Sequence, residues 1–329
     1  MPKQAVLLLA HGTPETVEQI PEYLRNVVSG RPLPEHVVEE IKHRYSLIGH
    51  SPLTEITLEQ GRLVEAELAM GGVDALVYVG MRNWKPYIPD VVRKMRADGV
   101  TEAAVICLAP QNSRTSVGLY KRAVQAEAGS VNIDFTEGWA QDPLLADAFA
   151  ERLRAAESRM KDETGAPVPV LFTAHSVPLR TVQPPDVAEG QSAGPRLWPG
   201  EGADPYAQEA KHTAELVAER IPEIPKWWFA FQSQGASLGP WIGPTVEETL
   251  TAIAGEGVKT LLLQPIGFLC DHVEILYDVD IAFKQYAAKL GIRLERPESL
   301  NASPALARAI AGLAKRGLAR LQDNNSPIT

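Results

Sequence analysis

Residues 5–14 read AVLLLAHGTP, six apolar residues followed by a loop of small and turn-forming ones. A short apolar run without alternation is typical of a strand that is buried on both faces of a parallel sheet. Further runs of this kind lie at 75–80, 103–109, 168–173, 227–231 and 260–264, between stretches of helical periodicity. Strands that alternate with helices predict a doubly wound α/β fold, with helices on both faces of each sheet.

Helical periodicity, together with Pro, Ser or Thr near the expected N-termini, predicts the helices. They are expected at 14–28, 34–47, 54–70, 86–98, 113–128, 143–161, 205–220, 244–255, 272–290 and 303–321.

The second half of the chain repeats the opening. Residues 173–178 read TAHSVP and match LAHGTP at 9–14, and each segment follows an expected strand. This predicts two related lobes, with a cleft between them at the carboxyl ends of the strands, where open α/β sheets bind ligands. Chance similarity of short motifs is the alternative. We place the lobes at residues 1–145 and 146–302, and expect the helix near 303–322 to pack back on the first lobe.

Composition excludes several classes of protein. The 329 residues carry a net charge of −9, which argues against a nucleic-acid partner because phosphates require basic residues. No segment has the form of a secretory signal or the roughly 20 apolar residues of a membrane span. Cys107 and Cys270 lie in or just after apolar runs and are expected to be buried. We therefore expect a cytoplasmic protein.

Common catalytic motifs are absent from the sequence. It contains no dinucleotide-binding glycine motif after a strand, no phosphate-binding P-loop, no esterase G-x-S-x-G and no H-E-x-x-H. Residues 183–205 are rich in Pro and Gly, which predicts either a surface insertion or a lid over the site.

The segment 271–280, DHVEILYDVD, is the strongest candidate for a site. On an α-helix, Asp271, Glu274 and Asp278 would lie along one face. Carboxylates placed together repel one another, and a passing cation would offset the repulsion. A solvated acidic face near a helix N-terminus is the alternative interpretation. The apolar run 261–268 places this helix at the end of a buried strand, where ligands bind.

Two histidines follow strands, and one tryptophan lies in a constrained loop. His175 follows the strand at 168–173 and His11 follows the first strand. Either imidazole could accept a proton or bind a transition metal, or could be a hydrogen-bonded core residue. Trp241 lies in the Gly- and Pro-rich loop 239–245, where it offers a flat apolar surface to a ligand or to the protein core.

Taken together, these motifs resemble the ferrochelatase family, which inserts iron into porphyrins in haem biosynthesis. The matching segments are AHGTP at 10–14, Tyr45, SPL at 51–53, APQ at 109–111, TAHSVP at 173–178, QS at 232–233, GPWIGP at 239–244, PIGF at 265–268 and DHVE at 271–274. The resemblance runs in order over most of the chain. It implies two Rossmann-like lobes of the chelatase type, with a porphyrin between them.

The resemblance also implies roles for individual residues. His175 and Glu274 would be the catalytic and metal-binding pair, because an imidazole and a carboxylate can accept the pyrrole protons or hand over iron. Asp278 and His272 would be a possible relay for iron or protons. The residues expected to bind the porphyrin are His11, Arg31, Tyr45, Ser51, Tyr120 and Trp241. Ferrous iron and the porphyrin are the expected substrates.

Three departures from the family pattern concern the substrate and the relay. His11 stands where Gram-positive relatives carry a Tyr, and Val28 and Ser29 replace a pair of arginines, which leaves Arg31 for propionate contacts. Both leave open the choice between coproporphyrin III and protoporphyrin IX. Ala282 stands where many relatives have another carboxylate. No cysteine cluster follows Arg316, so we expect no iron–sulfur cluster.

Three other functions compete with this hypothesis. The first is a chelatase for another metal and another tetrapyrrole. The second is a non-catalytic porphyrin or haem carrier on the same fold, which would need a ligand such as His11 but no Glu274. The third is an unrelated α/β enzyme with an acidic surface helix. We expect a monomer with no nucleic-acid partner and no integral membrane segment.

Overall fold

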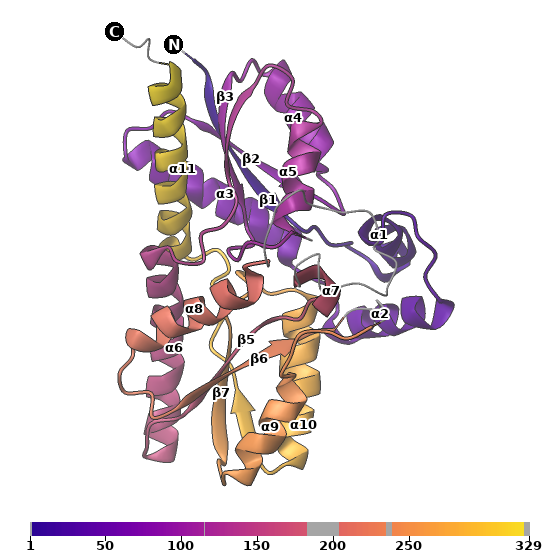
Figure 1. Cartoon of the computed structure of the whole chain (residues 1–329), viewed down its shortest axis with the longest axis vertical. Helices are drawn as coiled ribbons and strands as arrows, with labels where there is room; N and C mark the ends of the chain where they lie inside the picture. The colour runs from indigo at the N-terminus through magenta and orange to yellow at the C-terminus, as the bar shows by residue number, and fades with distance from the viewer. Residues whose placement is uncertain (1, 115, 183–203, 235–238, 326–329) are drawn as a thin grey trace. The chain divides into compact units, whose positions relative to one another are not determined.

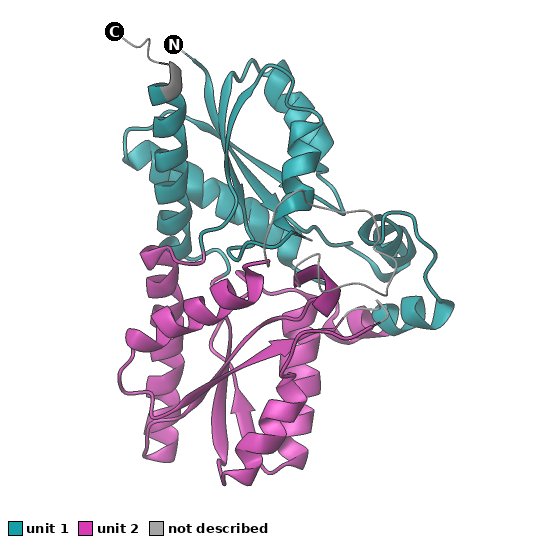
Figure 2. Ribbon diagram, in the orientation of Figure 1, with its two compact units in different colours: residues 1–42, 50–139, 301–329 teal, residues 43–49, 140–300 magenta. Residues whose placement is uncertain are grey.

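The computed structural model describes residues 2–114, 116–182, 204–234 and 239–325. The chain divides into two compact units (Figure 2). Unit 1 comprises residues 1–42, 50–139 and 301–329, and unit 2 comprises residues 43–49 and 140–300. Each unit is built on a four-stranded parallel sheet with helices on both faces, which confirms the predicted α/β fold. The lobe limits at 1–145 and 146–302 and the cleft stay predictions.

The sheet of unit 1 has the strand order β2-β1-β3-β4 (Figure 1). Its strands are β1 (Gln4–Ala10), β2 (Leu76–Met81), β3 (Glu102–Cys107) and β4 (Asn132–Thr136). β1 is central and pairs in parallel with β2 and β3, so that Leu9 lies opposite Gly80 on one side and Cys107 on the other. The carboxyl ends of these strands therefore meet at one edge, just before His11.

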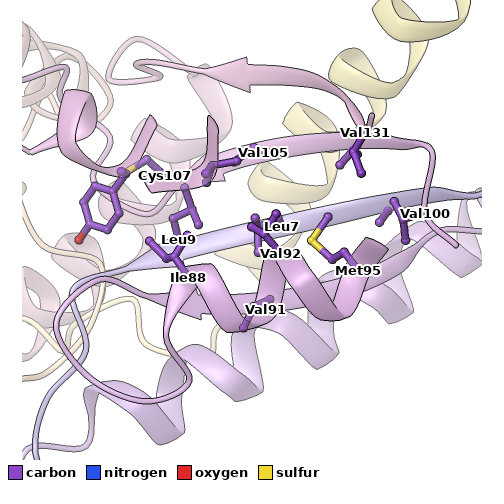
Figure 3. Packing of buried hydrophobic residues seen from close by; sticks show 14 of the residues in the cluster. Leu7, Leu9, Ile88, Val91, Val92, Met95, Val100, Val105, Cys107 and Val131 are labelled. Carbon is purple, nitrogen blue, oxygen red and sulfur yellow. The ribbon is translucent and has the colours of Figure 1, made fainter. Parts of the chain in front are cut away.

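Helices cover both faces of this sheet because β1 is apolar on both sides. The helices that cover it are α3 (Leu53–Met70), α4 (Ile88–Ala97), α5 (Val117–Gln125) and α11 (Pro304–Asn325). The chain between β1 and α3 forms η1 (Val17–Gln19), α1 (Ile20–Val27) and α2 (Glu35–Ile48, whose residues 43–48 belong to unit 2). Leu7 and Leu9 pack against α4 and α5, and Figure 3 shows Val92 and Met95 of α4 in this cluster. The other face receives α3 and α11. Gly317 lets α11 approach the sheet closely, because a Cβ there would lie 3.0 Å from the Ala104 side chain.

Unit 2 repeats this arrangement with the strand order β6-β5-β7-β8. Its elements are α6 (Pro143–Thr164), β5 (Val170–His175), α7 (Leu179–Val182), α8 (Tyr206–Glu219), β6 (Trp227–Gln232), α9 (Val246–Gly255), β7 (Thr260–Pro265), η3 (Glu274–Phe283), α10 (Lys284–Lys289) and β8 (Arg293–Glu295). Leu171, Leu261 and Leu263 pack against α9 and η3 on one face. α6 contacts β7, and α8 contacts α6 and β6.

The two sheets match strand for strand. In each unit the first strand is central, the second lies on one side of it, and the third and fourth lie on the other. This supports the repeat predicted from the two AH-containing segments. Two strands and one short helix were not predicted: β4 is a partly exposed edge strand with polar residues, β8 has three residues, and α7 has four.

The helix expected at 272–290 differs most from its prediction. It begins as a ten-residue π-helix, η3, and continues as the α-helix α10. The helix expected at 113–128 is shorter and spans Val117–Gln125. Most of the segment 183–205, predicted to be a lid or insertion, lies outside the described residues. Among the residues that the structure describes, no helix is long and apolar enough to cross a lipid bilayer.

Candidate active site

His175 is the last residue of β5 and lies at the carboxyl edge of the unit 2 sheet. Tyr206 of α8 donates its hydroxyl to the His175 carbonyl at 2.8 Å, which fixes the backbone there. The imidazole Nδ1 lies against the carbonyl of Ser176 and donates to it in the tautomer that satisfies this contact. The other ring nitrogen, Nε2, is therefore free to carry a lone pair toward a proton or a metal.

Glu274, the first residue of η3, lies between two imidazoles. Its Oε1 is 3.2 Å from His175 Nε2, and its Oε2 is 3.4 Å from His272 Nε2. His272 Nδ1 in turn donates to the Cys270 carbonyl at 3.0 Å. The side chains of His175 and Glu274 are 30% and 31% exposed, so this pair is accessible to a ligand. The structure thus brings together the two residues predicted to be catalytic, although they are 99 positions apart.

The two groups shift each other's pKa in opposite directions. Burial alone would lower the pKa of His175, but the Glu274 carboxylate and its hydrogen bond outweigh burial and raise that pKa above its usual value. Burial would raise the pKa of Glu274, but His175 and His272 together hold it well below its usual range. Each group therefore favours the charged form of the other.

Asp278 lies one turn farther along η3 and has a different environment. Ser233 Oγ donates to its Oδ2 at 2.5 Å, and Arg44 Nη1 of α2 lies 3.3 Å from its Oδ1. Burial and the Glu274 charge raise the pKa of Asp278 to about 6, although Ser233 and Arg44 act in the opposite direction. A carboxyl group with this pKa exchanges protons readily near neutral pH.

Two residues at the end of β6 form hydrogen bonds to η3. Thr173 Oγ1 donates to Gln232 Oε1 at 2.6 Å, and Gln232 Nε2 donates to the Glu274 carbonyl at 3.3 Å. Ser233 follows with a φ of 63°, a left-handed conformation that few side chains adopt. This turn directs its hydroxyl toward Asp278. Strain of this kind persists where surrounding contacts fix the backbone, often at functional sites.

One prediction about the acidic segment was wrong. Asp271 does not form a row with Glu274 and Asp278, because it precedes η3 and is bound elsewhere. Its Oδ1 accepts a hydrogen bond from Ser299 at 2.6 Å and lies 3.1 Å from Arg296 Nη2. Only Glu274 and Asp278 remain available for a passing cation.

Two predicted porphyrin-binding residues belong to unit 2. Trp241 forms an antiparallel bridge with Pro178, so its loop lies beside the segment that follows His175. Ser176 Oγ, which donates to the Ile242 carbonyl at 2.8 Å, also ties these two segments together. Tyr45 is buried in α2 next to Arg44, whose guanidinium lies 5.1 Å from the Tyr277 ring centre.

The other predicted porphyrin-binding residues belong to unit 1. His11 Nε2 lies 2.9 Å from the Tyr23 hydroxyl and 3.0 Å from Asn83 Nδ2. Tyr120 is buried in α5, with the Arg82 guanidinium 5.2 Å from its ring centre. The hydroxyl of Ser51 is buried and has no hydrogen-bond partner among the described residues. Arg31 is exposed, and its Nε donates to the Val28 carbonyl at 3.0 Å.

The sequence analysis did not identify three residues that shape this site. Arg44 lies in a helix whose pattern carries no functional signal, and Tyr206 lies at the start of another. Ser233 belongs to a matching segment but had no assigned role; its position directly after a buried strand was the available signal. All three residues shape the site through contacts with residues that are distant in the sequence.

The candidate metal ligands are few. Within the described ranges, no group of three or more His, Cys, Asp or Glu side chains has the geometry to hold a metal ion. A resident metal is usually bound by three or four protein ligands.

Solved structures place this fold among the chelatases. The chain resembles SirB from Bacillus subtilis with Fe3+, with a TM-score of 0.56 and 15% identity over 98% of both chains. It also resembles the sirohydrochlorin chelatase SirB from Bacillus subtilis subspecies spizizenii in complex with cobalt, with a TM-score of 0.55 and 12% identity over 98% of this chain and 97% of the other. At these identities the likeness defines the fold, a chelatase-like α/β protein.

The sequence comparisons define the family. The sequence model described as Ferrochelatase matches residues 3–318. A ferrochelatase of Acidobacterium capsulatum is 61% identical, over 99% of this chain and 98% of that protein. A coproporphyrin III ferrochelatase of a Geobacillus species is 33% identical, over 94% of this chain and 96% of that protein. The chain belongs to the ferrochelatase family, which confirms the resemblance seen in its motifs.

Proposed function

We propose that this enzyme inserts ferrous iron into a porphyrin through His175 and Glu274. One observation carries the proposal: the imidazole Nε2 and the carboxylate Oε1 are 3.2 Å apart at the carboxyl edge of a parallel sheet, and both side chains are accessible. Ligands of α/β proteins bind at such edges. Family membership supplies the reaction, and the geometry supports these two residues as the groups that perform it.

The reaction must balance two protons against one metal ion. As Fe(II) enters a free-base porphyrin, four nitrogens bind the metal and two pyrrole N–H groups lose their protons. Iron that reaches Glu274 displaces any proton on His175 Nε2 to solvent, because a cation lowers the pKa of a neighbouring imidazolium. When the iron moves on to the porphyrin, Nε2 becomes a base that accepts one pyrrole proton. The second proton passes to Glu274.

His272 and Asp278 complete a route for these protons. His272 Nε2 lies 3.4 Å from the second oxygen of Glu274, so it can take the proton that this carboxylate receives. Asp278, with its pKa raised to about 6, can hold a proton or a cation near neutral pH. Arg44 and Ser233 hold its carboxylate in place.

The segments that match the family pattern also suggest which residues bind the porphyrin. We propose that His11, Arg31, Tyr45, Ser51, Tyr120 and Trp241 contact the macrocycle or its propionates. The unpaired buried hydroxyl of Ser51 supports this, since a ligand oxygen would satisfy it. The relative named coproporphyrin III ferrochelatase supports coproporphyrin III as the substrate. Protoporphyrin IX is the alternative in the same assay.

Three further expectations from the sequence concern an iron–sulfur cluster, the cellular location and the oligomeric state. Cys107 and Cys270 are buried, and burial raises the pKa of each thiol to about 12, which disfavours the thiolate that a metal cluster needs. We therefore propose that neither thiol ligates an iron–sulfur cluster. We also propose a cytoplasmic monomer; light scattering during size-exclusion chromatography would test the oligomeric state.

Anaerobic metal insertion tests the proposal. Purified protein is mixed with Fe(II) and either coproporphyrin III or protoporphyrin IX, and absorbance follows the metallated product. We expect His175→Ala and Glu274→Gln to abolish turnover while each variant still quenches porphyrin fluorescence on binding. His212→Ala is the matched control, because His212 is a half-exposed histidine paired with Glu215. Full activity in both site variants would refute the assignment.

The assay also separates a carrier from an enzyme. A haem or porphyrin carrier would bind the ligand tightly and leave Fe(II) and free-base porphyrin unreacted. It would also be indifferent to the Glu274→Gln substitution. The presence of an imidazole–carboxylate pair favours the enzyme, because a carrier has no need of a base beside its ligand.

A further inference from the structure

The π-helix that carries Glu274 and Asp278 is unusually long. η3 spans ten residues, Glu274–Phe283, whereas π-helical segments are mostly single-turn bulges inside α-helices. A segment this long must be stabilised by tertiary contacts.

Arg296, just after β8, makes contacts that meet this requirement. Its Nε and Nη2 each donate to one oxygen of the Asp280 carboxylate at 2.8 Å. Its Nη2 also lies 3.1 Å from Asp271 Oδ1. The guanidinium is only 13% exposed, and a two-point pairing of this kind is directional as well as strong. One side chain thus binds a carboxylate before the helix and another within it.

The two carboxylates lie on either side of the start of η3. Asp271 precedes η3 by three positions, and Asp280 is the seventh of its ten residues. One guanidinium that pairs with both therefore ties the body of the helix to the segment that leads into it. Glu274 and Asp278 lie between these two points of attachment.

We propose that Arg296 is a positioning residue that holds η3 in its π-helical form and thereby aligns Glu274 and Asp278 with their partners. The inference rests on the proposed role of Glu274. Arg296 touches neither His175 nor Glu274. Lys284 supports the same carboxylate less well, since its Nζ is 4.0 Å from Asp280 and 3.2 Å from Glu295.

The first test separates positioning from folding by its kinetics. Arg296→Met removes the charge and keeps an apolar stem, and we expect kcat to fall about tenfold or more and the KM for Fe(II) to rise, because small misplacements of reacting groups are costly. The KM for the porphyrin should stay within about twofold. Arg296→Lys should recover part of the loss. Arg293→Met is the matched control, because Arg293 pairs with Glu163 and Glu295 at the surface.

Two further measurements test the Arg296–Asp280 contact itself, and the second does not depend on catalysis. Asp280→Asn should reproduce the Arg296→Met kinetics, and the double variant should be no worse than either single one, because both remove the same contact. Amide hydrogen exchange should accelerate in residues 274–283 of Arg296→Met and stay unchanged in Arg293→Met. Unchanged kinetics and unchanged exchange in Arg296→Met would overturn the inference. An inactive wild type would instead refute the proposed function, and the exchange data would still decide this one.

Discussion

The carboxyl edges of the two sheets are alike in fold and different in chemistry. Both first strands are central in sheets of the same order, and each leads into a histidine, His11 in unit 1 and His175 in unit 2. His11 contacts the phenol of Tyr23 and the amide of Asn83, whereas His175 contacts the carboxylate of Glu274. The shared fold places an imidazole after the central strand of each unit. The side chain that contacts the imidazole then determines whether it can become a charged acid–base group.

The difference arises after the third strand of each unit. In unit 2, β7 leads into η3, which begins with Glu274. In unit 1, β3 leads into α5, which begins with Val117 and has no acidic residue in its first turn. A carboxylate at this place costs stability unless it is paired, and in unit 2 the two histidines beside Glu274 pair with it.

The largest expected effect breaks the site of unit 2 and spares that of unit 1. His175→Ala should reduce turnover by about 10²- to 10⁴-fold, the usual contribution of a general acid–base group. His11→Ala should cost about tenfold or less, because its partners cannot turn it into a strong base. Anaerobic initial rates with one porphyrin measure both. Equal losses would show that the two histidines share the chemistry.

The second prediction compares the two cores. Leu7 and Leu171 are fully buried in the central strands of units 1 and 2. Leu7→Ala and Leu171→Ala should each lower the free energy of unfolding by about 2–5 kcal/mol, through lost burial and a residual cavity. Denaturant titration followed by circular dichroism measures this. A cost below about 1 kcal/mol in one unit would contradict equal packing of the two sheets.

The third prediction concerns Asp278, the buried carboxyl group beside the site of unit 2. Its pKa is 3.8 in an unperturbed carboxyl and about 6 in the folded protein, so the native state binds the proton more tightly than the unfolded state. Stability from this group therefore falls as pH rises from 4 to 6 and then stays level. Asp278→Asn should raise the free energy of unfolding by about 3 kcal/mol at pH 7.5 and leave it unchanged near pH 4.

Thermal unfolding of both proteins across this pH range checks the Asp278 prediction. Asp90→Asn in unit 1 is the control, because that carboxylate is exposed and should change stability by less than about 0.5 kcal/mol. A wild-type advantage over Asp278→Asn at pH 7.5 would mean that Ser233 and Arg44 outweigh burial.

The smallest expected effects concern two tyrosines, one beside each of the two histidines. Tyr23 bonds the ring of His11, and Tyr206 bonds the carbonyl of His175. Tyr23→Phe and Tyr206→Phe should each cost about 1 kcal/mol of stability, the net value of one hydrogen bond. Only Tyr206→Phe should also slow turnover, by a few-fold. Rates and unfolding curves of the pair test this, and a slower Tyr23→Phe would implicate His11 in the reaction.

Much of the fold could be predicted because its signals are local. The buried strands appear as apolar runs, and six of the eight were located to within a few residues of their ends. β4 and β8 were missed, since an edge strand with polar residues and a three-residue strand lack this signal. The two AH-containing segments indicated the repeat, because each marks the same turn after a central strand.

The candidate site was predicted less completely. His175 and Glu274 could be named from their motifs, and the position of each at the end of a buried strand was also local. Asp271 was assigned to the helix, but it precedes η3 and is bound by Arg296 and Ser299. No local pattern shows which turn a helix adopts when its stabilising partner, Arg296, lies in another element.

By itself, the sequence determined the α/β fold and the shared strand pattern of the two units, and it suggested the two candidate reactive groups, because hydrophobic periodicity and short motifs act over neighbouring residues. Only the tertiary structure decided which carboxylates face His175, which are bound by Arg296, and that burial raises the pKa of Asp278 to about 6. These properties depend on distances between side chains far apart in the chain and on how deeply each charge is buried.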